Sequence, residues 1–170
     1  MNWEAIGAIG ELFGGVVVVL TIIYLGQQIR QSNKFAKAEA ERDIQSQWTA
    51  ITDVILRDSE TREVLRKGVD SFDALSGSEK TAYSVYLSHV INHLEMVLKM
   101  ERDGLVSDDV AGTYKNVVTQ IVGTPGGREY WKVGKNLYQD LSTNHIEGFM
   151  KDSPDGISVA LSFWSPKASN

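Results

Sequence analysis

Apolar and polar positions divide this chain into one uninterrupted apolar run near the N-terminus and several amphipathic stretches after it. The run from Leu12 to Ile29 contains eighteen residues without a charged side chain. As a helix it is roughly 27 Å long, close to the thickness of the hydrocarbon core of a bilayer. Ten positions between Leu12 and Leu25 are Leu, Ile, Val or Phe, and together they favour insertion by roughly 3 to 6 kcal/mol. We therefore predict a transmembrane helix over residues 3–29.

Two other interpretations of this segment are a secretory signal peptide and a buried helix of a soluble protein. A signal peptide starts with basic residues and ends at a small-residue cleavage site. The opening MNWEAIG has no Lys or Arg, and no such cleavage site follows the run. An apolar run of this length is more typical of a membrane span than of a core helix.

The flanks of the run predict membrane anchors and an orientation. Trp3 and Tyr24 are 21 residues apart, roughly 31 Å along a helix, and suit the two interfaces of a bilayer. No basic residue precedes the run, whereas Arg30 follows it directly and further basic residues occur up to Arg42. The excess of basic residues on one side predicts that the N-terminus is outside and that the chain after Ile29 is in the cytoplasm.

Small residues gather on one side of the predicted span. At 100° per residue, the glycines and the two carboxylates of Glu4 and Glu11 share that side, while large apolar residues occupy the other. Lipid does not sort residues by size, but a neighbouring helix does, since small residues let two backbones approach closely. The predicted helix–helix interface consists of Gly7, Gly10, Glu11, Gly14, Gly15 and Val18. With one span per chain, the neighbouring helix belongs to another molecule, a second copy or a different membrane protein.

Helical periodicity continues through residues 30–152. An apolar stripe predicts that the span continues as an amphipathic helix ending near residues 57–60; it consists of Ala36, Ala40, Ile44, Trp48, Ile51 and Ile55. A capping box at Ser76 and Glu79 predicts a helix that ends at Gly104. Ser107 predicts the start of another, which ends at residues 123–127.

Two shorter helices complete the prediction, one over about 128–141 and one after an Asn144 cap. No stretch shows the sustained alternation of apolar and polar residues that is typical of a β-strand. The predicted fold is all-α, a single N-terminal transmembrane helix continuing into a cytoplasmic antiparallel helical bundle over 30–152. Residues 153–170 form a C-terminal tail, whose apolar ISVALSFW suits docking on the bundle or on a partner.

Several motifs resemble those of one family. WEAIGAIGE at Trp3–Glu11, the apolar run ending IYLGQQIRQ, DGL at Asp103–Leu105 and TPGGREYW at Thr124–Trp131 resemble an uncharacterised bacterial family that has an N-terminal membrane helix and a helical cytoplasmic region. The resemblance implies the same architecture and a location in the bacterial inner (cytoplasmic) membrane. It implies no established activity.

The amino-acid composition excludes several classes of partner and site. A net charge of −5 and a pI near 5.2 give no basic footprint, so we expect no nucleic-acid partner. The lack of cysteine excludes disulfides, iron–sulfur clusters and thiol catalysis.

His89 and His93 have the spacing that can hold one zinc ion, but no HExxH motif accompanies them. The two histidines are better explained as polar residues on a helix of the bundle. The segment TPGGR could bind an anion through its backbone N–H groups, but the segment is better explained as a turn between two helices.

Three hypotheses of function follow from the sequence. The first is a membrane-anchored, self-associating assembly or interaction protein with no enzymatic activity, no cofactor and a cytoplasmic protein partner. The second is a small homo-oligomeric cation channel with acidic rings from Glu4 and Glu11. The third is a membrane-tethered metal-dependent enzyme that uses His89 and His93. The sparse site signals favour the first.

Overall fold

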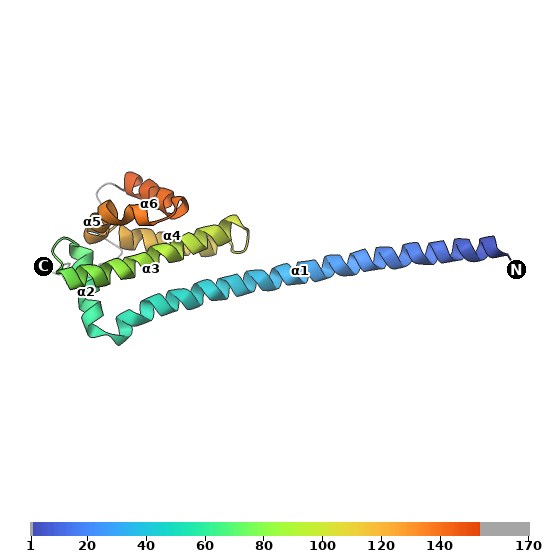
Figure 1. The fold of residues 1–170 in the computed structure, drawn as a ribbon, viewed down its shortest axis with the longest axis horizontal. Helices are drawn as coiled ribbons and strands as arrows, with labels where there is room; N and C mark the ends of the chain where they lie inside the picture. The colour runs from blue at the N-terminus through green and yellow to red at the C-terminus, as the bar shows by residue number, and fades with distance from the viewer. Residues whose placement is uncertain (1, 154–170) are drawn as a thin grey trace. The chain divides into compact units, whose positions relative to one another are not determined.

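The computed structural model describes residues 2–153, and this part of the chain is all-α (Figure 1), as predicted. The predicted tail lies outside the described residues, apart from Ser153. The elements are α1 (Trp3–Arg57), α2 (Ser59–Asp70), α3 (Gly77–Arg102), α4 (Asp108–Val122), α5 (Pro125–Gly134), the short 3-10 helix η1 (Lys135–Leu137) and α6 (Asp140–Asp152).

The internal contacts divide the chain into two compact units, Met1–Glu39 and Ala40–Asn170. The described part of the first unit is the N-terminal portion of α1. The second unit contains the remainder of α1 and the helices α2 to α6. The predicted membrane boundary at Ile29 follows from hydropathy and not from these contacts, so it stays a prediction.

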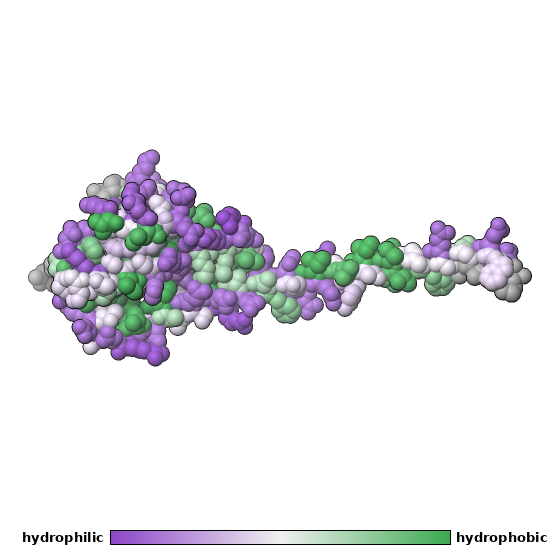
Figure 2. Space-filling view, in the orientation of Figure 1, coloured by the Kyte–Doolittle hydropathy of each residue, from purple (hydrophilic) through white to green (hydrophobic). Residues whose placement is uncertain are grey.

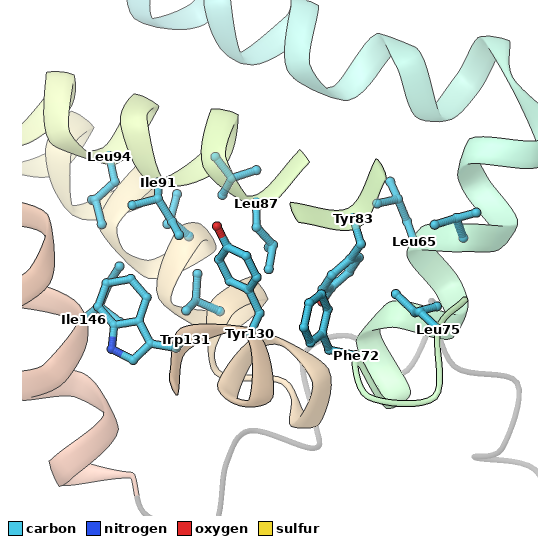
Figure 3. Packing of buried hydrophobic residues seen from close by; sticks show 14 of the residues in the cluster. Leu65, Phe72, Leu75, Tyr83, Leu87, Ile91, Leu94, Tyr130, Trp131 and Ile146 are labelled. Atoms are coloured by element: carbon cyan, nitrogen blue, oxygen red, sulfur yellow. The ribbon is translucent and has the colours of Figure 1, made fainter. Parts of the chain in front are cut away.

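The second unit is built around α3, which contacts α2, α4 and α6. Figure 1 shows α3 and α4 side by side and running in opposite directions, as their short connection requires. A large apolar cluster joins α3 to α2, α4, α5 and α6 (Figure 3). Its most enclosed members include Tyr83, Leu87, Ile91, Leu94 and Ile146, which are fully buried.

A second apolar cluster joins the C-terminal portion of α1 to α3 and α4. Ala40 and Ile44 of α1 are buried there with Val97 of α3 and Ala111 of α4. Trp48 lies between the two clusters and packs against both. The apolar stripe predicted for this helix is therefore confirmed from Ala40 onward.

Helix ends follow local chemistry where the capping residues lie close in sequence. The Ser76 N–H donates to Glu79 Oε2 at 2.9 Å, and the Glu79 N–H donates to Ser76 Oγ at 3.5 Å, so the predicted capping box is formed. Gly104 ends α3's last turn with φ +69°, a conformation that favours glycine. Ser107 caps α4 as predicted.

The prediction for the last two helices is wrong at their boundaries. α5 begins at Pro125 instead of Arg128, and Thr124 caps it through a 3.1 Å hydrogen bond from the Gly127 N–H. The predicted helix over 128–141 is broken after Gly134, and Asn144 lies inside α6 instead of capping it.

A carboxylate from another helix caps α6. Gln139, the residue before α6, makes no capping hydrogen bond with its side chain. Instead, Glu95 of α3 accepts a 2.8 Å hydrogen bond from the Ser142 N–H in the first turn of α6. Burial acts to raise the pKa of Glu95, but the hydrogen bond from Ser142 and the nearby ammonium group of Lys99 outweigh it and hold this pKa below its usual value. Sequence spacing does not reveal this cap, because Glu95 is 47 residues away.

Gly126 brings the backbone of α5 into direct contact with that of α2, and Gly68 of α2 makes room for Tyr83 of α3. A Cβ atom on Gly126 would lie 1.7 Å from the carbonyl oxygen of Gly68, far inside van der Waals contact. A Cβ on Gly68 would lie 2.3 Å from the ring of Tyr83. The TPGG segment therefore serves as a helix start and a close-packing surface.

We expect Gly126→Ala to lower the free energy of unfolding by at least about 2 kcal/mol, because the added methyl must separate α2 from α5. Gly148→Ala is the matched control, since Gly148 lies inside α6 and its Cβ would meet nothing within 4 Å. The control should be neutral or stabilising by about 0.5–1 kcal/mol. Thermal unfolding of the full chain in mild detergent, followed by circular dichroism, measures both. Equal melting temperatures for the two variants would contradict the α2–α5 contact.

Candidate functional site

The N-terminal portion of α1 exposes a continuous apolar surface (Figure 2). An 18-residue window within α1 has a mean hydropathy of 1.9, and none of it is buried within the described residues. Leu12 is 70% exposed and Leu25 is 49% exposed, and the apolar residues between them have similar values. This helix is long and apolar enough to cross a membrane.

The predicted interface residues lie on this surface. Gly7, Gly10, Gly14 and Gly15 are exposed, and a Cβ atom on any of them would meet nothing within 4 Å. Their small size is therefore not explained by packing within the described part of the chain. Glu11 is also exposed there.

A shallow hollow on α1 overlaps only part of the predicted interface. Its lining consists of Ala8, Glu11, Leu12, Gly15, Val16, Val19 and Leu20. The hollow shares Glu11 and Gly15 with the predicted glycine side and is rotated from it around the helix. Both surfaces are exposed, so the contact side of the helix stays a prediction.

The predicted anchors have the exposure that an interfacial role requires. Trp3 is 71% exposed and Tyr24 is 59% exposed. The Tyr24 hydroxyl accepts a 2.8 Å hydrogen bond from Gln28 Nε2, and these two residues lie six and two positions before Arg30. Arg30 is exposed as well. Their role as membrane anchors stays a prediction.

The two histidines of α3 have different environments. His89 is exposed, whereas His93 is only 3% exposed. The His93 ring lies between Trp48 of α1, with ring centroids 5.4 Å apart, and Tyr114 of α4, with centroids 5.2 Å apart. Neither ring nitrogen of His93 has a hydrogen-bond partner. This imidazole is a packing element between helices, and no group of three His, Cys, Asp or Glu side chains among the described residues could hold a metal ion.

Burial lowers the pKa of His93 to about 4, so the ring is neutral at physiological pH. Its aromatic neighbours carry no charge there either, and burial raises the pKa of Tyr114. The Tyr114 hydroxyl donates to Gln45 Oε1 at 3.0 Å and so links α4 to α1. The aromatic cluster of Trp48, His93 and Tyr114 thus holds the C-terminal portion of α1 on α3 and α4.

The TPGGR segment is occupied by intramolecular contacts. Gly126 lies against the Gly68 backbone, and the Gly127 N–H is used by the Thr124 cap. Arg128 donates from Nε to the Gly123 carbonyl at 3.0 Å and from Nη2 to the Ser153 carbonyl. The segment therefore forms the helix–helix turn that the sequence favoured.

Packing creates two polar clusters that the sequence did not predict. A cleft between α4 and α6 is lined by Lys115 and His145, and Lys115 forms a 2.6 Å ion pair with Glu101. Desolvation, followed by the charge of Lys115, lowers the pKa of His145.

The second polar cluster consists of the hydroxyls of Ser88, Tyr130 and Tyr138, which form hydrogen bonds with one another. Burial raises the pKa of Tyr138, so this hydroxyl stays protonated. The hydrogen bonds among the three hydroxyls link α3 to the α5–η1 region.

We expect the free energy of unfolding to decrease as the pH falls from about 6.5 to about 4, in part because of His93. Its pKa lies near 4 in the folded state and near 6.5 in the unfolded state, so the unfolded chain takes up the proton first. His93→Phe removes up to about 3 kcal/mol of this pH dependence. His89→Gln, at an exposed position of the same helix, should leave it unchanged. Urea unfolding of the full chain between pH 4 and pH 7 tests this, and identical slopes for wild type and His93→Phe would contradict it.

Comparisons with known proteins assign no family: no family model, no curated protein and no solved structure matches this chain. The resemblance of its motifs to an uncharacterised bacterial membrane family stays an interpretation of the sequence.

Proposed function

We propose that this chain is a membrane-anchored helical protein that self-associates through its first helix and presents its helical bundle to cytoplasmic protein partners. The observation that carries the proposal is the fully exposed apolar window of α1. An apolar surface of this size is rare on a soluble monomer and marks a membrane or protein contact.

The energetics support a bilayer as the environment of this window. The apolar residues from Leu12 to Leu25 favour insertion by roughly 3 to 6 kcal/mol, whereas one carboxylate at the centre of a span opposes it by about 2.5 to 3.5 kcal/mol. Glu11 lies one residue before the charge-free run, toward its edge, where the penalty is smaller. The helix inserts on balance, and Glu11 gains from a polar partner.

The glycines support contact with another helix. Each glycine within a helix costs roughly 0.5–1 kcal/mol relative to alanine. Gly68 and Gly126 of the bundle are explained by close contacts, whereas the four glycines from Gly7 to Gly15 have open space around them. Gly112 and Gly148 of the bundle also have open space, but each is isolated, whereas the four glycines of α1 lie close together. Close approach of a second membrane helix offsets this cost and gives Glu11 a partner.

The other two hypotheses have less support. The packing of His93 between aromatic rings gives no support to a metal site at His89 and His93. The cation channel with rings from Glu4 and Glu11 stays a prediction, and ion flux through reconstituted vesicles is its test.

The full chain should stay in the membrane fraction after alkaline carbonate extraction, with its N-terminus outside. A C-terminal alkaline phosphatase fusion is then inactive, because the reporter stays in the cytoplasm, while a C-terminal green fluorescent protein fusion is fluorescent. Extraction of the wild-type chain by carbonate would contradict the anchor. An active phosphatase fusion would contradict the orientation alone.

Gly14→Leu should weaken self-association by about tenfold or more, because the added side chain separates the two backbones. Glu11→Gln should preserve the oligomer, since an amide of similar volume still forms hydrogen bonds across the interface. Glu11→Leu should assemble poorly, although it inserts into the membrane more readily. Crosslinking and native mass measurement in detergent give the oligomer distribution.

Val16→Leu is the matched control for Gly14→Leu, because it adds bulk on the opposite side of the same helix. It should leave the oligomer unchanged. If Gly14→Leu and both Glu11 variants also keep the wild-type oligomer, the glycine side is not the interface.

A further inference from the structure

We propose that a basic face of α1, formed by Arg30, Lys34 and Lys37, binds the phosphate headgroups of anionic phospholipids at the membrane surface. This inference rests on the proposed function, since it requires the preceding residues to span the bilayer. It adds the class of lipid that the protein selects.

The charge pattern of this segment has one sign. Between Leu12 and Ala38 the only charged side chains are Arg30, Lys34 and Lys37, and Glu39 is the first acidic residue after them. This part of the chain has a local charge of +3, although the chain as a whole has a net charge of −5. The cations are therefore concentrated directly after the apolar run.

The three cations share one side of the helix. They are spaced four and three residues apart, so neighbouring side chains lie on the same face. Like charges at this spacing repel and destabilise an isolated helix. A multivalent anionic surface relieves that repulsion.

None of these cations is neutralised within the described part of the chain. Arg30, Lys34 and Lys37 are exposed, and none of them takes part in a hydrogen bond or ion pair with another described residue. In particular, Lys37 forms no ion pair with Glu41, which lies four residues after it. Lys67 of the bundle, by contrast, pairs with Glu79 at 2.9 Å. The basic face is thus available to an external anion.

The geometry suits the headgroup layer. Lys37 is eight residues beyond Ile29, roughly 12 Å along the helix axis. Helical side chains tilt toward the N-terminus of their helix, which here is the direction of the membrane, and a lysine stem extends several ångströms further. All three charged groups therefore reach the layer of lipid phosphates. Each cation close to an anionic surface strengthens binding by about fivefold.

The test measures lipid selectivity of the full chain in vesicles of phosphatidylcholine with a minor fraction of phosphatidylglycerol. Spin-labelled phosphatidylglycerol and phosphatidylcholine report which lipid is held next to the protein. We expect wild type to prefer the anionic lipid severalfold. The variant R30Q/K34Q/K37Q should reduce this preference to within about twofold of unity, and high salt should do the same to wild type.

The variant R62Q/K132Q/K151Q is the control, because it removes the same number of positive charges from exposed positions of the bundle. It should keep the wild-type preference. An equal preference in wild type and R30Q/K34Q/K37Q would overturn the inference, as would an equal loss in both triple variants, which would indicate an effect of net charge alone.

Flotation with pure phosphatidylcholine vesicles separates this inference from the proposed function. Wild type and R30Q/K34Q/K37Q should both float and resist alkaline extraction, because the span inserts without anionic lipid. If wild type does not float, the proposed anchor fails and the lipid selectivity fails with it. If wild type floats but shows no preference for the anionic lipid, the anchor stands and the basic face is refuted.

Discussion

The apolar surface of α1 between Leu12 and Leu25 has nothing in the described chain to bury it. Exposing that surface to water is unfavourable by about 25 cal/mol for each Å², and this cost is the physical basis of the proposed bilayer and helix contacts. The remaining helices form an apolar core of their own. The chain thus combines a bundle with a buried apolar core and a helix whose apolar surface is exposed.

Within the bundle, stability is organised around α3. Its apolar side chains contribute to both clusters, and its Glu95 caps α6 from a distance in sequence. A buried carboxylate normally destabilises a fold, but here the Ser142 N–H at the start of α6 and the nearby Lys99 compensate for its burial. Similarly, Glu129 of α5 accepts hydrogen bonds from Ser71 and from the Asp73 N–H, and these bonds lower its pKa and fix the connection between α2 and α3. Long-range carboxylate bonds therefore determine how α5 and α6 dock.

The aromatic cluster explains the burial of His93. The spacing of His89 and His93 could suit a zinc ion, but the sequence favoured two polar residues on a bundle helix, and His93 packs between Trp48 and Tyr114. Because α1 reaches this cluster through Trp48, the packing of the neutral imidazole helps to fasten α1 to the bundle.

Local sequence determined the features that depend on neighbouring residues: the helical periodicity, the all-α class, the capping box at Ser76, the stop at Gly104 and the long apolar run. These follow from interactions within one or two helical turns. Only tertiary structure decided where α5 ends and α6 begins, since the α6 cap comes from Glu95, and why Gly126 is a glycine, since the contact lies on α2. It also decided the environment of His93, because partners on α1 and α4 are distant in sequence. The glycine side of α1 could be identified from sequence by its spacing, but a contact with a second molecule is encoded in neither the local pattern nor the fold of one chain.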